Sequence, residues 1–257
     1  TLSGISNLSL LATTTIITQA VTPTPFLWLF PLCVFLLSFI IAFSGKWYQR
    51  GYYLGVLSFS ILFLLLEMNT YISIKSYWFK TALIIFVQFL INLVCHSELY
   101  SSKPKPEKLT YFYLSISLGG VLGSITSALL APLFFKDFWE FPLSLVLGVF
   151  LYVTIATTKS ITWQQISSHL LVGTIILFFI ILSVANSDKN NLGANQKVMH
   201  SQRNFYGVIK VTEEKIDQES AIQKTLFNGK INHGVQKFNT PDSGTPTSYY
   251  APTGGIG

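Results

Sequence analysis

The sequence predicts an α-helical polytopic membrane protein with six or seven transmembrane helices, followed by a small β module. Half of the 257 residues are hydrophobic and only 11% are charged, whereas a soluble domain has about 25% charged residues. Residues 1–44 contain no Asp, Glu, Lys or Arg, but the last 72 residues hold 8 of the 17 basic and 6 of the 11 acidic side chains. We therefore expect a transmembrane bundle at 1–186, a polar linker at 187–200 and a β module at 201–257.

Six apolar stretches are long enough for membrane helices, since a bilayer core of about 30 Å needs about 20 apolar residues. They are residues 26–43, 52–66, 79–94, 112–135, 142–157 and 166–184. A seventh stretch, 5–21, is uncharged but rich in Ser and Thr, and the sequence leaves open whether it spans the bilayer or lies at its surface. Tryptophans at positions 47, 78, 139 and 163 fall at predicted helix ends, where the ring prefers the headgroup zone.

The net charge of +6 does not indicate nucleic-acid binding, because the lysines lie singly in short loops and form no basic stripe. Contact with anionic lipid headgroups accounts for it better. Counted loop by loop, the basic residues divide equally between the two sides, so the side of the tail stays undetermined. Cys33 and Cys95 lie in apolar runs, with no spacing typical of a disulfide or a zinc site.

Two sets of residues in the predicted bundle suggest specific roles. Gly119, Gly120 and Gly123 in "SLGGVLGS" form a small-residue face that lets another helix approach closely; a substrate path between helices is the alternative.

The second set is polar. His96, Glu98 and Glu140 fall at helix ends and predict a polar cluster at the membrane interface, where water could also simply solvate them. We predict no metal site, because a fourth ligand is lacking. Gln88 and Asn92, one helical turn apart, could hydrogen-bond a neighbouring helix.

The tail has the pattern of short strands. The stretch "NFYGVIKVTEE" predicts one strand kinked at Gly207. The stretch "AIQKTLFNGKINHGVQKF" predicts two strands joined by a turn at Asn228-Gly229, a dipeptide that favours hairpins. We expect a sheet of three or four strands.

Four motifs in order give the chain a family resemblance. The stretches "PFLWLFPLCVFLLSFIIAF", "LVCHSELYSSKPKPEKLTYFYLSISLGGVLGS" and "APLFFKDFWEFPL" resemble the membrane portion of bacterial proteins in which transporter-like helices are fused to a spermidine synthase-like domain. The tail, from "RNFYGVIKV" to "PTSYYAPTGGIG", is similar to the β module that precedes the Rossmann-type domain of that family. The resemblance implies that this following domain binds decarboxylated S-adenosylmethionine. We expect no cofactor in the present chain.

The resemblance also implies three substrate-binding positions. Tyr206 matches a tyrosine of the first strand, Gln236 a glutamine that faces the substrate, and Tyr249 the start of a Tyr-His-Glu pattern. The tripeptide "YYA" at 249–251 keeps only that tyrosine, and Asn228 replaces a family aspartate. Losing the histidine and glutamate weakens polyamine binding, because a cationic amine prefers carboxylates. From the residues alone, these tyrosines would equally suit a hairpin core.

Two classes of function follow. The first is a membrane scaffold or accessory subunit of a larger assembly in the bacterial inner membrane, with the lipid bilayer and other membrane subunits as partners, no nucleic acid, and no catalytic residue in this chain. The second is the front half of an active aminopropyltransferase-like enzyme whose Rossmann domain lies outside the chain. A polyamine transporter is disfavoured, because the predicted spans contain hardly any carboxylate and cation pathways are usually lined by acids.

Overall fold

The computed structural model describes most of the chain in two compact units. The described residues are 2–20, 26–45, 48–69, 76–159, 162–185, 196–204, 207–215, 221–229, 231–241, 243–245, 247 and 251. One unit is a helical bundle formed by Thr1–Ala131 and Phe138–Ala185, and the other combines Pro132–Asp137 with Asn186–Gly257.

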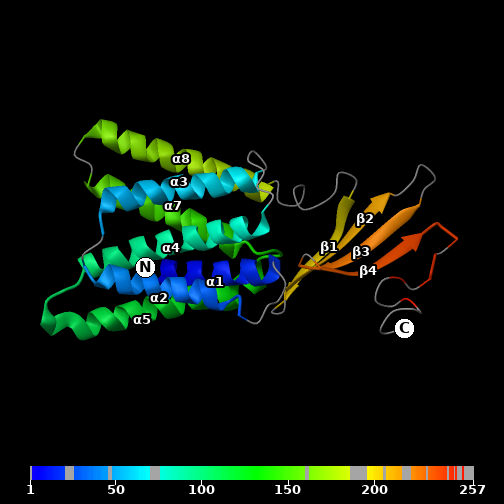
Figure 1. Cartoon of the computed structure of the whole chain (residues 1–257), viewed down its shortest axis with the longest axis horizontal. Coiled ribbons are helices and arrows are strands. Elements are labelled where there is room, and N and C mark those ends of the chain that lie inside the picture. The colour runs from blue at the N-terminus through cyan, green and yellow to red at the C-terminus, as the bar shows by residue number, and fades with distance from the viewer. Residues whose placement is uncertain are drawn as a thin grey trace. The chain divides into compact units, whose positions relative to one another are not determined.

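The described residues form eight α-helices, with one short 3₁₀ turn and one π-helical segment (Figure 1). They are α1 Leu2–Ala20, α2 Leu29–Phe43, α3 Arg50–Met68, α4 Tyr77–Ser101, η1 Pro106–Lys108, α5 Leu109–Ile125, η2 Thr126–Leu130, α6 Ala131–Phe134, α7 Glu140–Lys159 and α8 Trp163–Ala185.

Five stretches of the described chain are helical, long and apolar enough to cross a membrane. They are Arg50–Met68, Trp78–Ser101, Pro106–Phe134, Glu140–Thr158 and Trp163–Ala185, and they match five of the six predicted spans. The sixth, 26–43, coincides with α2, which is apolar but shorter. A count of six or seven spans therefore stays a prediction.

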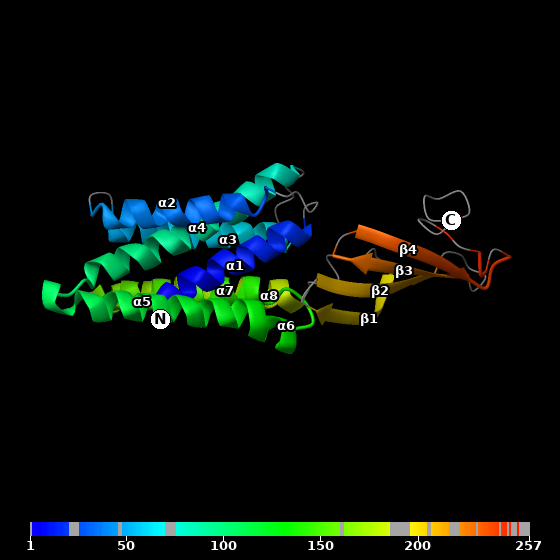
Figure 2. The same cartoon turned by 90° about the horizontal axis from the view of Figure 1, so that it is seen from below.

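The Ser/Thr-rich α1 lies inside the bundle, between α4 and α5 (Figure 1, Figure 2). It also contacts α7. Ser6, Ala12 and Ile17 are fully buried. Helix α1 is therefore an interior helix of the bundle, and whether it spans the bilayer stays a prediction.

The apolar core lies among α3, α4, α7 and α8. Leu57, Ile91, Leu145 and Ile176 are almost completely buried in it. The outward sides of α5 and α8, in contrast, expose large apolar side chains, including Leu118, Leu122, Leu171, Phe178 and Ile181. An apolar outer surface of this extent is typical of helices that face lipid.

A π-helical segment lies within the long helical stretch Pro106–Phe134. The N–H of Ala131 donates to the carbonyl of Thr126, five residues earlier. Pro132 follows directly and has no N–H to donate, so the regular hydrogen-bond ladder is already interrupted here. The π-helical hydrogen bond and the proline lie next to each other, so the helix widens locally where one regular backbone hydrogen bond is already missing.

Three predicted packing glycines lie where α5 meets α1. A Cβ atom on Gly123 would lie 2.2 Å from the carbonyl oxygen of Gly4, and one on Gly119 would lie 3.3 Å from the Ser3 Cβ. A Cβ on Gly120 would lie 3.1 Å from the Asn7 amide nitrogen. The two backbones are close enough that only hydrogen fits at Gly123, which is the small-residue packing of membrane helices.

The second unit contains a four-stranded antiparallel meander in the order β1-β2-β3-β4, with β1 Gln196–Asn204, β2 Gly207–Lys215, β3 Ile222–Asn228 and β4 Ile231–Phe238. The hairpin predicted at Asn228-Gly229 is confirmed: Asn228 pairs with Ile231, and Gly229 has a φ of 59°. Strand β1 begins at Gln196, within the segment assigned to the linker; residues 186–195 lie outside the described chain.

The prediction of a single strand kinked at Gly207 is wrong. Asn204 pairs with Gly207, so the chain reverses there and Gly207 begins β2. The Asn204 side-chain oxygen accepts a hydrogen bond from the Gly207 N–H at 3.1 Å, and Gly207 has a φ of 147°. A local Asn-to-backbone bond and a glycine conformation therefore set a turn where the apolar pattern suggested continuity.

Asp137 connects the segment Pro132–Asp137 to the β sheet. Its carboxylate pairs with Lys210 at 2.5 Å, and its backbone carbonyl accepts from Arg203 at 2.6 Å. Side chains of two adjacent strands, β1 and β2, thus bind this segment.

We expect the substitution Gly123→Ala to destabilise the bundle, because its methyl group would overlap the backbone of Gly4. Overpacking of this kind costs about 1–3 kcal/mol, which lowers the melting temperature by roughly 5 °C for a bundle of this size. Gly55→Ala is the matched control, since nothing lies within 4 Å of its added methyl, and helix propensity makes it neutral or stabilising. Equal melting temperatures for the two purified variants would contradict the packing.

Candidate binding pocket beside His96

A pocket of about 450 Å³ lies within the bundle, among α1, α2, α4 and α5. Its apolar walls are Phe35, Phe39, Leu99, Ile116, Val121 and Ile125. Its polar lining is Ser3, Asn7, His96, Ser117 and Ser124. None of the described residues that line it is Asp, Glu, Lys or Arg.

His96 is the most deeply buried polar side chain of the lining, with 2% of its surface exposed. Its Nε2 lies 2.8 Å from the Ser6 hydroxyl on α1, and its Nδ1 lies 3.0 Å from the Ser38 hydroxyl on α2. The rings of Phe35 and Phe39 meet the imidazole edge to face at 5.0 and 4.8 Å. The histidine thus joins three helices.

The neighbouring hydrogen bonds identify the tautomer of His96. Ser38 donates its one hydroxyl proton to the carbonyl of Phe35 at 2.7 Å, so it accepts from His96 and the proton of the ring is on Nδ1. Nε2 then accepts from Ser6. The Ser6 hydroxyl also lies 3.2 Å from the side-chain oxygen of Asn92. Hydrogen-bonding groups thus connect Asn92, Ser6, His96 and Ser38.

His96 belongs to a polar stripe on α4. Gln88, Asn92 and His96 are spaced by four residues and share one helix face, with exposures of 1%, 0% and 2%. The Gln88 side chain donates to the carbonyl of Pro31 on α2 at 3.1 Å. The sequence predicted that Gln88 and Asn92 hydrogen-bond a neighbouring helix, but it predicted a solvated helix end for His96. The same spacing of four residues continues from Asn92 to His96, and this pattern indicates that His96 shares their helix face.

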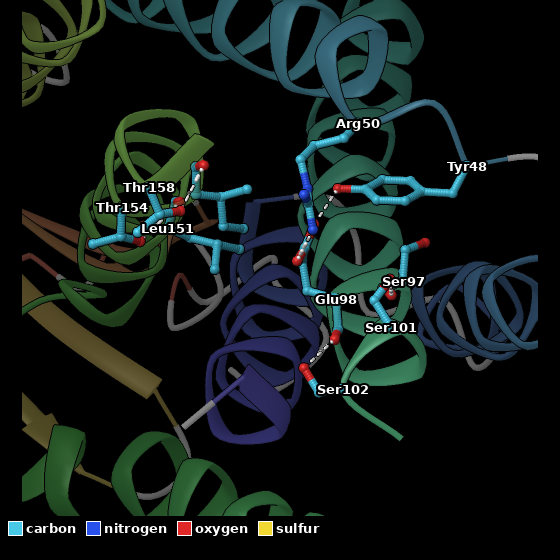
Figure 3. Close-up of polar contacts among 10 residues, drawn as sticks. Tyr48, Arg50, Ser97, Glu98, Ser101, Ser102, Leu151, Thr154 and Thr158 are labelled. Atoms are coloured by element: carbon cyan, nitrogen blue, oxygen red, sulfur yellow. Dashed lines mark hydrogen bonds and ion pairs between the residues drawn. The ribbon is translucent and has the colours of Figure 1, made fainter. Parts of the chain in front are cut away.

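Glu98 lies in a different environment, two residues further along α4 (Figure 3). Its carboxylate accepts two hydrogen bonds from the Arg50 guanidinium, each of 2.6 Å, and one of 3.0 Å from the Tyr48 hydroxyl. Burial, reinforced by the Glu98 charge, raises the pKa of Tyr48 well above its ordinary value, so the phenol stays protonated and donates. Residues two apart on a helix face different directions, which separates Glu98 from His96.

A second ion pair closes the other end of the same helix hairpin. Glu67 near the end of α3 pairs with Lys80 near the start of α4 at 2.5 Å. Arg50 and Glu67 are 17 positions apart, or about 26 Å along a helix. The two pairs therefore bracket an uncharged length close to the thickness of a bilayer core, about 30 Å.

Glu140 is the first residue of α7 and is almost fully buried. A carboxylate at a helix N-terminus is favoured by the helix dipole. In the part of the chain that the structure describes, no three His, Cys, Asp or Glu side chains are grouped so that they could hold a metal ion. His96 and Glu98 have separate sets of partners and do not form a common site.

The positions implied by the family resemblance are only partly described. Gln236 is exposed on β4, opposite Lys224 of β3. Tyr206 and Tyr249 lie outside the described residues. The substrate-binding role expected for the three stays a prediction.

Two serines of the pocket lining differ from most other hydroxyls of the bundle. Most Ser and Thr side chains there donate to a carbonyl three or four residues earlier in their own helix, as Ser101, Ser102 and Thr154 do (Figure 3). Within the described chain, Ser117 and Ser124 of α5 have no hydrogen-bond partner. Their hydroxyls are available to a bound molecule.

No protein-family model, curated protein or solved structure matches this chain. The likeness to spermidine synthase fusion proteins therefore stays a prediction.

We expect Glu98→Gln to lower the stability of the bundle by about 1–2 kcal/mol, because it removes the charge from three hydrogen bonds at a mostly buried carboxylate. The control is Glu107→Gln, an exposed residue of η1. Thermal unfolding of both variants in the same detergent measures the difference. A loss of equal size in both would show that the Arg50–Glu98 contact contributes nothing specific.

Proposed function

We propose that the helical bundle is a membrane-embedded binding protein that takes up a small molecule from the bilayer into the pocket beside His96. One observation carries the proposal: a buried, fully hydrogen-bonded histidine lies in the wall of a pocket that is lined by the two candidate membrane helices α4 and α5 and the shorter apolar helices α1 and α2. Ionisable residues at such depth commonly belong to functional sites. The volume also lies within the range of pockets that hold small ligands.

The opening of the pocket supports entry from the bilayer. Helices α2 and α5 both line the pocket but make little or no direct contact with each other. Val121 and Ile125 of the lining are 53% and 37% exposed. They continue into the outward apolar side of α5 that includes Leu118 and Leu122, so the pocket opens toward the surface expected to face lipid.

The test is to close the pocket and ask whether a bound molecule is lost. Val121→Trp adds a large ring at the opening, and Leu122→Trp adds the same ring at the next position, outside the lining. The proteins are purified from membranes, extracted with organic solvent and compared by mass spectrometry. We expect a small molecule in stoichiometric amount in the wild type and Leu122→Trp, and its loss from Val121→Trp. Identical extracts from all three proteins would refute the proposal.

A second candidate function is a membrane scaffold or accessory subunit of the bacterial inner membrane that presents the β sheet to another protein domain. Its supporting observation is one face of the sheet, where Ile209, Leu226 and Ile231 are 38–40% exposed. The strand register places Ile209, Asn228 and Ile231 in one row, and Leu226 lies two residues from Asn228 on the same face. Apolar side chains gathered in this way favour a covering partner. The alternative, that this face adjoins a Rossmann-type aminopropyltransferase domain, accounts for the same observation.

The mass of the native polypeptide separates these two alternatives. A mass near the 28.8 kDa of this chain favours an accessory subunit. A mass that is larger by that of a further domain of roughly 150 residues favours the enzyme. Substituting Leu226→Lys would then be expected to release the covering partner or domain from the sheet, detected by limited proteolysis. An unchanged digestion pattern would count against a partner on this face.

A further inference from the structure

Resting on the proposed binding function, we infer that the ligand is an uncharged amphipathic lipid whose head group carries hydroxyl or carbonyl oxygens. The inference names the chemical class of the ligand and the side chains that recognise it. It rests on the charge of the lining, the free hydrogen-bonding groups and the distribution of apolar walls.

The absence of formal charge in the described lining selects against ionic ligands. The nearest acidic residue in sequence to His96 is Glu98, and its carboxylate is already bound by Arg50 and Tyr48. A cationic amine or a phosphate in the pocket would lose its hydration without gaining a counter-charge, which is strongly unfavourable in a low-dielectric site. Polyamines and the head groups of anionic phospholipids therefore do not fit the pocket.

The free polar groups of the lining suit oxygen atoms of a ligand. Ser117 and Ser124 lie seven residues apart on α5 and so share one helix face, about 10 Å apart. On the same helical stretch Pro106–Phe134, Ser115 and Thr126 donate to the carbonyls of Tyr111 and Leu122, four residues earlier. The two serines that line the pocket thus have hydroxyls left to donate to, or accept from, a head group.

Asn7 adds a third free group from α1. Its amide nitrogen donates to the carbonyl of Ser3 at 3.0 Å, and its side-chain oxygen has no partner among the described residues. Gly120 lies between the two serines and against the Asn7 amide. Because this position has no side chain, the polar groups of α1 and α5 adjoin the same part of the pocket.

The apolar walls account for the rest of the ligand. Phe35 and Phe39 are fixed by their edge-to-face contacts with His96, and they offer flat surfaces from α2. Val121 and Ile125 lead from the pocket to the exposed side of α5. A head group held among the serines and Asn7 can therefore extend an apolar chain between α2 and α5 into the bilayer.

Two kinds of membrane lipid share this chemistry: neutral glycerolipids with a free hydroxyl, and isoprenoid quinones with ring carbonyls. The probes are dioctanoylglycerol and decylubiquinone, compared with dioctanoyl phosphatidylglycerol and spermidine as charged probes. Each is titrated into the purified full chain in detergent, and the affinity is taken from the ligand-dependent rise in melting temperature. We expect at least one uncharged probe to bind more tightly than both charged probes, and the probe that binds identifies the source.

Variants then test the recognition. We expect Ser117→Ala combined with Ser124→Ala to lower the affinity for the uncharged probe by about 10- to 30-fold, because two hydrogen bonds are lost. The matched control combines Ser115→Ala with Thr126→Ala, which removes two hydroxyls of the same helix that do not line the pocket, and should leave the affinity unchanged.

Three outcomes overturn the inference. They are no rise in melting temperature with either uncharged probe, tighter binding of a charged probe, and equal affinity in the serine variant and its control. The proposed function is tested separately. If a charged probe binds and Val121→Trp abolishes its binding, the proposed binding function is supported and only the inferred class of ligand is refuted. Identical extracts from the wild type and Val121→Trp would refute the proposed binding function itself.

Discussion

The close contact between α1 and α5 is the constraint on which the rest of the bundle depends. At Gly4 and Gly123 only hydrogen atoms separate the helices, and this allows a Ser-rich helix of modest hydrophobicity to lie inside the bundle. The same contact holds Ser6 against His96 and Asn7 beside Gly120. A larger residue at Gly123 would push α1 outward and separate the groups that form one side of the pocket.

Buried polar groups follow from this arrangement, and the structure satisfies them in two ways. Where α1, α2 and α4 meet, hydroxyl and amide side chains form hydrogen bonds around His96. Where α3 and α4 end, opposite charges pair, at Arg50–Glu98 and Glu67–Lys80. Neutral groups are thus kept within the bundle and charges at its ends, as expected where water is scarce along the helices and present at their termini.

The pocket lies between helices that are not all packed against one another. Helices α2 and α5 both border it without packing against each other, and the small residues of α5 that permit the approach of α1 leave little side-chain volume nearby. The π-helical segment begins directly after Ile125, at the end of the lining. Such π-helical segments are frequent at functional sites.

The sequence by itself determined five membrane-length helices, the hairpin at Asn228-Gly229 and the small-residue face of α5, because apolar length, turn chemistry and glycine spacing are local properties. It also contained the spacing of Gln88, Asn92 and His96, which fixes a shared helix face. Only the tertiary structure decided that this face meets α1 and α2, that Glu98 turns to Arg50, and that Gly207 begins a strand. The helical period tells which residues lie on one side of a helix, but the neighbour on that side is set by packing between segments far apart in the chain.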